Sequence, residues 1–132
     1  VTDGNVRKDF PGGFTGDEVN KFTREGRTKA ENAMFDWLSR LLHWRQGNDV
    51  VTKGRQVQFI PYNGVYVVAR QNKGKTVLTI LNGKRTENTL SVNRYAEVIG
   101  SASTATDVIT GDKVDISKDV VLPARAAIIL EF

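Results

Sequence analysis

One amphipathic helix is predicted in the first half of the chain, where apolar residues recur at intervals of three and four. The residues that carry this spacing are Met34, Trp37, Leu38, Leu41 and Leu42. Such spacing places side chains on one side of an α-helix. Thr28 and Glu31 precede this run and have the spacing of a capping box. Gly47 follows the run as a helix stop. We therefore predict a helix over residues 28–46.

The apolar surface of this helix is wider than one stripe, because Phe35 and Trp44 extend it. A helix at the surface of a domain needs only one apolar stripe. We therefore expect the helix to be covered on more than one side, partly by the strands that follow and partly by a region outside this sequence. In the chain alone, the rest of this surface is expected to be hidden by self-association through the helix or by residues 1–27 folding across it.

After Gly47 the period of the pattern changes to two, as expected for strands. The short β-prone runs are residues 57–60, 65–70, 76–81, 96–99, 106–109, 114–116 and 127–132. Turn residues separate them, and Asn63-Gly64 between two runs is the strongest local signal for a hairpin. The predicted fold is mainly β, an antiparallel β-sandwich of Greek-key type preceded by a glycine-rich loop and one α-helix.

The change of period also marks a boundary between residues 1–47 and 48–132. Residues 1–27 are predicted to be loop, since Gly and Pro interrupt every periodic run. An ordered loop of this length is unusual inside a compact domain, and such segments tend to be functional rims or disordered tails. The first residue is not Met, which we take as a sign of processing, truncation or fragmentation.

The charge of +4 adds little, because the charges are dispersed. Residues 1–47 hold 8 Lys and Arg against 7 Asp and Glu, and residues 48–132 hold 11 against 8, so the halves carry +1 and +3. Without a basic stripe, a nucleic-acid partner is not predicted. No apolar run approaches the ~20 residues of a membrane span. The absence of cysteine excludes disulfides, thiolate metal sites and thiol catalysis.

Residues 6–17, followed by Asn20-Lys21-Phe22, resemble a loop of the α-amylase superfamily. In members of neopullulanase or cyclomaltodextrinase type, the loop after the eighth barrel strand commonly reads R-x-D-F-P-G-G-W-x-G-D, with N-x-F behind it. Residues 35–45 look like the last barrel helix of that family. Residues 65–70, 77–82 and 107–111 match, in order, its C-terminal sandwich, called domain C. Phe14 stands where the family often has Trp.

The resemblance implies a C-terminal fragment of a retaining glycoside hydrolase that acts on α-1,4-linked glucans such as starch, pullulan or cyclodextrin. Residues 1–47 would be the last βα loop and final helix of the catalytic (β/α)8 barrel, and residues 48–132 the C-terminal domain. Retaining hydrolysis needs two carboxyl groups about 5–5.5 Å apart. In the family these come from barrel strands four and five, which precede this sequence. We therefore assign no catalytic residue, no metal and no cofactor to the chain, and expect it to be structural and non-catalytic alone.

Four residues of the loop are candidate substrate-binding residues in the parent enzyme: Asp9, Phe10, Phe14 and Asp17. Loops at the C-terminal face of such a barrel form the mouth of the active site. Carboxylates there can bind sugar hydroxyls, and flat rings can face a pyranose. Alternatively, Asp9 and Asp17 are solvated or cap turns, and the two phenylalanines fasten the loop to the barrel. The resemblance also implies a periplasmic or extracellular protein.

Two functions remain open for the chain itself. One is a structural domain whose partner is the missing catalytic barrel, with an α-glucan oligosaccharide bound by the parent enzyme. The other is a carbohydrate-binding β-sandwich module that acts without catalysis. Such modules usually expose a row of aromatic rings, whereas Tyr62, Tyr66 and Tyr95 are expected to be scattered within packed strands. The structural role is therefore favoured.

Overall fold

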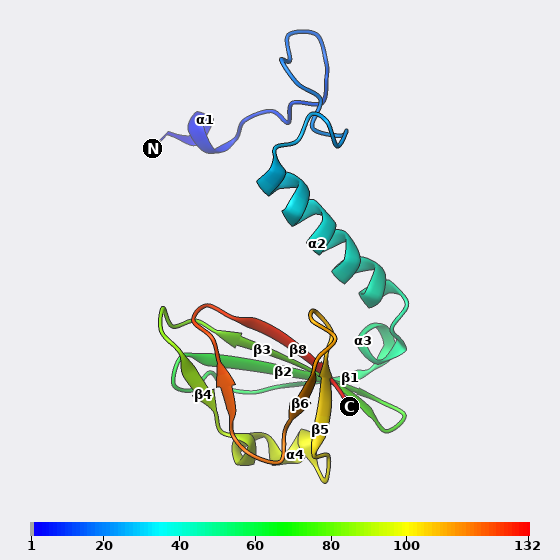
Figure 1. The fold of residues 1–132 in the computed structure, drawn as a ribbon, viewed down its shortest axis with the longest axis vertical. Coiled ribbons are helices and arrows are strands. Elements are labelled where there is room, and N and C mark those ends of the chain that lie inside the picture. Colours follow the sequence, from blue (N-terminus) through cyan, green and yellow to red (C-terminus); the bar gives the residue numbers. More distant parts are fainter. Residues whose placement is uncertain (1) are drawn as a thin grey trace. The chain divides into compact units, whose positions relative to one another are not determined.

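The computed structural model describes residues 2–132 and divides the chain into two compact units (Figure 1). The first unit extends to His43, and the second covers Trp44–Phe132. The long helix α2, Lys29–Gln46, begins in the first unit and ends in the second.

The first unit is a loop followed by most of α2. The short helix α1, Asp3–Val6, is the only helix or strand of the described residues before α2, so the predicted loop is interrupted by one helical turn. The helix predicted over residues 28–46 is confirmed, and it begins as the capping box requires. Glu31 Oε2 accepts the Thr28 N–H at 2.7 Å, and Thr28 Oγ1 accepts the Glu31 N–H at 3.3 Å.

The second unit is a mainly β, antiparallel sandwich. Its elements are α3 Asp49–Lys53, β1 Arg55–Gln58, β2 Val65–Asn72, β3 Lys75–Asn82, β4 Asn88–Leu90, the 3-10 helix η1 Val92–Tyr95, α4 Ala96–Ile99, β5 Thr104–Asp107, β6 Lys113–Asp115, β7 Val120–Leu122 and β8 Ala127–Glu131. Six strands form one sheet in the order β1-β2-β3-β8-β5-β6, and β4 pairs with β7 in a second sheet. Every strand pair is antiparallel. The predicted fold class is confirmed.

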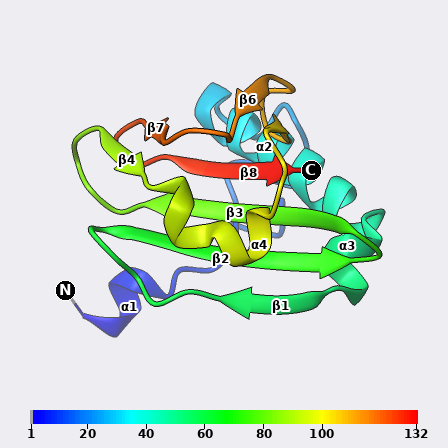
Figure 2. The ribbon, with the colours of Figure 1, turned by 90° about the horizontal axis from the view of Figure 1, so that it is seen from below.

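The core lies between the large sheet and a layer made of the small sheet, η1 and α4. Alternate residues of β2 and β3 point to this face because successive side chains of a strand point to opposite sides, and Val67, Leu78 and Ile80 are fully buried there. Leu90 of β4 and Leu122 of β7 come from the opposite layer. In Figure 2 the coil of α4 lies across the face of β2 and β3.

The other face of the large sheet is partly covered by the short helix α3. Asn48 caps α3, and its Oδ1 accepts the Val50 N–H at 3.0 Å. The side chain of Asn48 also donates to Glu131 Oε1 at 2.6 Å, and Trp44 Nε1 donates to the same oxygen at 3.0 Å. Glu131 therefore joins the end of α2 and the start of α3 to β8.

Two hairpin turns fold as their sequences indicate. Asn63 and Gly64 have φ of 50° and 73°, and Lys73 and Gly74 have φ of 50° and 77°. Two successive residues with positive φ define the turn whose twist suits two-residue hairpins. The prediction of a hairpin at Asn63-Gly64 is confirmed by the pairing of Tyr62 with Val65.

The predicted strand at residues 96–99 is wrong, because this segment is the helix α4. Val98 and Ile99 are buried against the sheet together with Tyr95 of η1. A four-residue apolar run does not distinguish a buried strand from a buried helical turn. Residues 108–109, predicted as strand, form a turn, and Asp107 Oδ1 accepts the Ile109 N–H at 2.8 Å.

Candidate functional site

The glycine-rich loop of the first unit folds back on itself around Asn20. Gly12 and Asn20 form an isolated antiparallel bridge, and the Lys21 N–H donates to the Pro11 carbonyl at 2.8 Å. The rings of Phe10 and Phe22 pack with centroids 4.8 Å apart. The loop is therefore closed at its base by backbone pairing and one aromatic contact.

One glycine of this loop, Gly26, stands where no side chain fits, and a second, Gly12, lies close to the exposed rings of Phe14 and Phe22. A Cβ at Gly26 would overlap the carbonyl oxygen of Asn20, and a Cβ at Gly12 would lie 2.8 Å from the Phe22 ring. Asn20 in turn accepts the Phe22 N–H at 2.9 Å through its Oδ1. The Gly and Asn residues of the motif therefore set the shape of the loop.

Charged groups fasten the loop to the start of α2. Lys21 Nζ lies 2.6 Å from Glu31 Oε2, and this bond, with the backbone N–H of Thr28, lowers the pKa of Glu31 to about 2. The Arg27 guanidinium donates to the Asn32 side chain at 2.8 Å and stacks on the Phe35 ring at 4.1 Å. The loop and the first two turns of α2 thus form one unit through local contacts.

The structure brings some of the four candidate loop residues together and separates others. Asp17 Oδ2 accepts the Phe14 N–H at 3.0 Å, so Asp17 caps the turn that carries Phe14. Phe14 is 68% exposed, and Asp9 is exposed as well. Phe10 is 55% exposed although it packs on Phe22. Asp17 is exposed although it caps the turn, so all four candidate residues are open to solvent.

An apolar face of α2 is exposed along most of the helix. At about 100° per residue, Met34, Phe35, Leu38, Leu41 and Leu42 span about 120° of the helix, and Trp37 and Trp44 widen this arc to about 180°. None of the residues of α2 is buried. The exposed fractions are 62% for Met34, 52% for Phe35, 44% for Leu38 and 52% for Leu42. We call the arc from Met34 to Leu42 the open face of α2.

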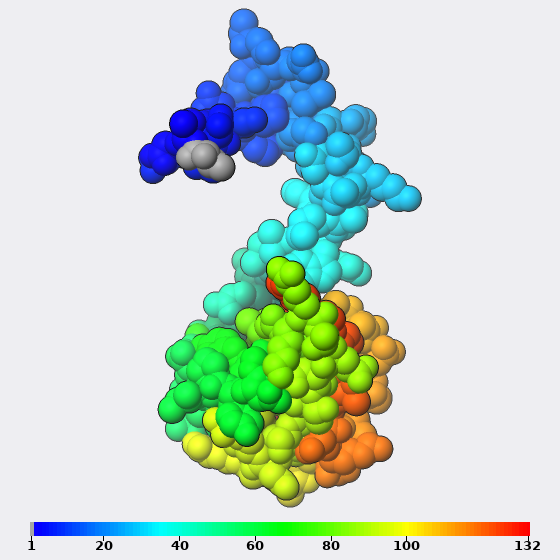
Figure 3. Space-filling view, turned by 90° about the vertical axis from the view of Figure 1, so that its left-hand side faces the viewer, coloured from blue at the N-terminus to red at the C-terminus, as the bar shows by residue number. Residues whose placement is uncertain are grey.

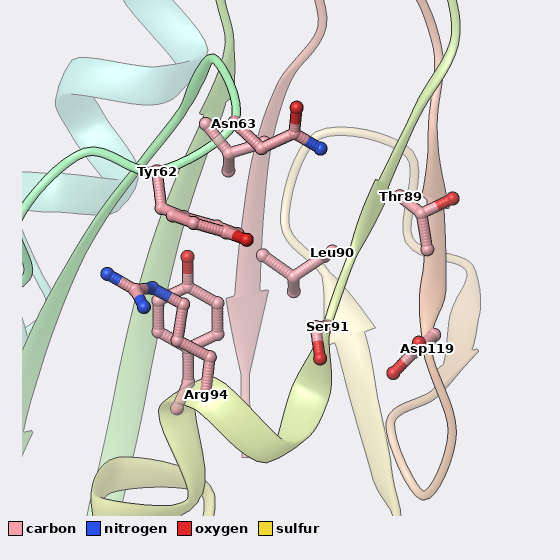
Figure 4. A pocket seen from close by; sticks show the side chains of 9 residues that line it. Tyr62, Asn63, Thr89, Leu90, Ser91, Arg94 and Asp119 are labelled. Atoms are coloured by element: carbon pink, nitrogen blue, oxygen red, sulfur yellow. The ribbon is translucent and has the colours of Figure 1, made fainter.

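A pocket of about 220 Å³ lies on the sandwich, between the Asn63-Gly64 hairpin, the end of β4 with η1, and the residue before β7. The space-filling view shows the segments near residues 60, 90 and 120 adjoining on one face of the second unit (Figure 3). In Figure 4, Tyr62 and Arg94 lie on one side of the pocket, and Thr89 and Asp119 on the other, with Leu90 between them.

Polar contacts fix the groups around this pocket. The Arg94 guanidinium stacks on the Tyr62 ring at 4.4 Å and donates to the Ile60 carbonyl at 3.4 Å. Asp119 Oδ1 accepts the Val92 N–H at 3.1 Å. Tyr95 is buried against Phe59, and burial raises the pKa of its hydroxyl. The pocket therefore combines an exposed ring, one cation and one carboxylate over a buried base.

The sequence did not indicate this pocket. The expectation that the three tyrosines are scattered within packed strands is wrong for Tyr62, which is 59% exposed beside the hairpin and shares the pocket with Tyr95. Tyr66 follows Val65 on β2 and is half-buried. The available signal was the position of Tyr62 immediately before Asn63-Gly64, where a side chain projects from a tight turn.

Metal-binding clusters and membrane-spanning helices are both absent from residues 2–132. In this range, no group of three or more His, Asp or Glu side chains is placed to hold a metal ion. Within the same residues, no helix has both the length and the apolar character to cross a membrane.

The family of the sandwich is shown by its sequence. The sequence model of the cyclo-malto-dextrinase C-terminal domain family matches residues 56–131, more than half of the chain. The chain belongs to this family. The matched segment runs from β1 to the end of β8 and includes every residue that lines the pocket.

Solved structures share the fold. AmyP in complex with maltose is similar over 79% of this chain and 21% of that chain, with a TM-score of 0.66 and 16% identity. The α-amylase of Geobacillus thermoleovorans complexed with acarbose is similar over 80% of this chain and 23% of that chain, with a TM-score of 0.64 and 17% identity. The trehalulose synthase MutB is similar over 87% of this chain and 20% of that chain, with a TM-score of 0.60 and 16% identity. The chain spans about a fifth of the length of these proteins.

Proposed function

We propose that this chain is the C-terminal part of an α-amylase superfamily glycoside hydrolase of neopullulanase or cyclomaltodextrinase type. The observation that carries the proposal is the family match over residues 56–131, since the family is named for the C-terminal domain of such an enzyme. The parent hydrolyses α-1,4-glucosidic bonds of starch, pullulan or cyclodextrin with retention. The chain itself is structural and non-catalytic.

In this proposal, residues 1–47 supply the last βα loop and final helix of the catalytic barrel, and residues 48–132 are the C-terminal domain. The open face of α2 supports this role. Outer helices of a (β/α)8 barrel pack their apolar side on the strands. An exposed apolar face of this kind marks a surface that another protein region covers. The missing barrel is the partner that fits it, and self-association covers it in the chain alone.

The loop residues take the roles that the resemblance gives them. Phe14 presents its ring to a pyranose face from the turn that Asp17 caps, and Phe10, which packs on Phe22, presents a second ring. Asp9 and Asp17 bind sugar hydroxyls of the α-glucan oligosaccharide. The bound maltose of AmyP supports this choice of ligand. A periplasmic or extracellular location belongs to the same proposal.

Three carboxylates among residues 2–132 suit a structural role and not that of a general acid. A retaining glycosidase needs a general acid whose pKa is raised so that it holds a proton near neutral pH. Three carboxyl groups have clearly shifted pKa values, and all three shifts are downward: Glu31 through Lys21, Asp36 through Arg24, and Asp115 through Ser117. These groups are ionised at neutral pH and suit ion pairs and turns.

The proposal is tested by the coding sequence immediately before Val1, joined to one assay. We expect it to encode further (β/α) units with the two catalytic carboxylates and the supporting Asp. The longer polypeptide should release reducing sugar from cyclodextrin, pullulan or starch, and the purified 132-residue chain should not. An upstream region without barrel strands, or turnover by the short chain that survives repurification, would refute the proposal.

A further inference from the structure

The pocket on the sandwich has an apolar base and a polar rim. Val65, Leu90 and Tyr95 form the base and are 3%, 2% and 2% exposed. The hydroxyls of Thr89 and Ser91 stand on the exposed rim, and each is able to donate and to accept a hydrogen bond. A ligand therefore meets an apolar base with hydrogen-bonding groups around its edge, which is the usual construction of a small-molecule site.

The charges of the rim balance each other. Arg94 contributes one positive charge and Asp119 one negative charge, on opposite sides of the pocket. Arg94 is held in place by its stacking on Tyr62, so its remaining N–H groups are already oriented. The bond to Val92 occupies one oxygen of Asp119, and a carboxylate has two, which leaves the second for a ligand hydroxyl.

We propose that this pocket binds one ring of a neutral saccharide. A pyranose has an apolar face for the aromatic surface and hydroxyls that both donate to carboxylate and accept from guanidinium. A phosphate or sulfate is disfavoured because Asp119 faces the same space. At about 220 Å³ the pocket lies below the range of about 300–1,000 Å³ that drug-sized ligands occupy, which suits one ring of a longer chain.

The saccharide class follows from the pocket alone, and the choice of an α-1,4-glucan as ligand rests on the proposed function. The two ideas fail separately. The upstream coding sequence decides the parent enzyme, whereas binding to the 132-residue chain decides the pocket. A saccharide that binds without α-linkage preference would leave the pocket assigned and count against the α-glucan.

The site is tested by nuclear magnetic resonance titration of the full chain, labelled with 15N, with maltoheptaose as the probe. Cellohexaose serves as the comparison with β-linkage, and inorganic phosphate as the anion control. An open pocket of this size predicts a dissociation constant in the millimolar range. The expected shifts fall on the backbone amides of Asn63, Val92 and Asp119, and phosphate should produce none of them.

Tyr62→Ala and Asp119→Asn should each weaken maltoheptaose binding about five- to tenfold. Asp119→Asn keeps an acceptor for the Val92 N–H, so it removes the charge without removing the turn contact. Val121→Ala changes a 59% exposed residue of β7 that does not line the pocket and should leave binding unchanged. The proposal is overturned by shifts confined to residues 9–27, by no shift at millimolar maltoheptaose, or by full binding in both pocket variants.

Discussion

Different forces stabilise each of the two units of this chain. Every buried hydrophobic residue among residues 2–132 lies between Val50 and Leu130, in the second unit. The first unit instead relies on exposed ion pairs, a capping box and aromatic contacts at its loop. Burying one large apolar side chain contributes about 1.5–3 kcal/mol, whereas an exposed ion pair contributes about 0–1 kcal/mol.

The second unit has a buried apolar core. The loop and α2 of the first unit have a defined backbone conformation, but their apolar side chains are not buried. Both layers of the sandwich contribute apolar residues to its core, so we expect it to fold without a further surface. The loop and α2 have a defined local conformation while their apolar residues remain in solvent. Local shape without burial indicates a segment whose stability depends on what packs against it.

The comparison is tested most strongly by truncating matched leucines in the two units. Leu78→Ala removes a fully buried side chain of β3 and should lower the free energy of unfolding by about 2–5 kcal/mol. Leu38→Ala changes a 44% exposed side chain of α2 and should cost under about 0.5 kcal/mol. Urea denaturation followed by circular dichroism measures both. Equal costs would show that α2 is packed in solution.

Self-association is the next effect we expect, through the open face of α2. At micromolar concentrations the chain should sediment as more than a monomer, and the double variant Met34→Gln with Leu38→Gln should shift it toward monomer. Arg40→Gln lies outside the apolar arc and is the matched control. Analytical ultracentrifugation gives the masses. A wild-type chain that stays monomeric across the range, without binding a hydrophobic dye, contradicts a free apolar face.

A smaller effect is expected on the stability of the loop and the first turn of α2 when the pH is lowered. The pKa of Glu31 in the folded chain is about 2, below its ordinary value of 4.5, so its ionised form favours the folded loop. This contribution is complete above about pH 4.5 and is lost as the pH falls toward 2. Circular dichroism and the amide signal of Thr28 should report fraying of the first turn of α2 in that window. Glu31→Gln should abolish the pH dependence, and an unchanged titration in that variant would assign it elsewhere.

The smallest effect is expected from removing residues 1–27. The core of the second unit contains none of them, so the free energy of unfolding of residues 44–132 should change by less than about 0.5 kcal/mol. Urea unfolding of the shortened chain, followed by the far-ultraviolet circular dichroism of its strands, measures it. Loss of a cooperative transition would mean that the loop is structural for the sandwich.

The parts of the fold that local sequence governs were predicted well. The spacing from Met34 to Leu42 and the Thr28–Glu31 capping box define α2, and Asn63-Gly64 defines its hairpin, because these signals act within a few residues. The segment around Val98 and the strands β4 and β7 were missed or misassigned. They are three or four residues long, and tertiary packing rather than periodicity decides their conformation.

The two candidate sites, the glycine-rich loop and the pocket on the sandwich, also differ in how far the sequence predicts them. The loop motif could be recognised because its residues are contiguous, and the bond between Asp17 and Phe14 follows from a spacing of three. The pocket on the sandwich could not, since Tyr62, Arg94 and Asp119 are brought together only by the fold. Sequence separation of this kind leaves no periodic signal, so single-chain patterns do not reveal such a site.

The position of β8 has a consequence for synthesis of the chain. This strand is made after all the strands it joins, yet it lies between β3 and β5 in the sheet. Until it emerges, the β1-β2-β3 meander and the β5-β6 hairpin have no shared partner, and two strand edges stay open. Open edges invite pairing with other chains. A polypeptide that stops before residue 127 would therefore leave the edges of β3 and β5 unpaired, and we expect it to aggregate.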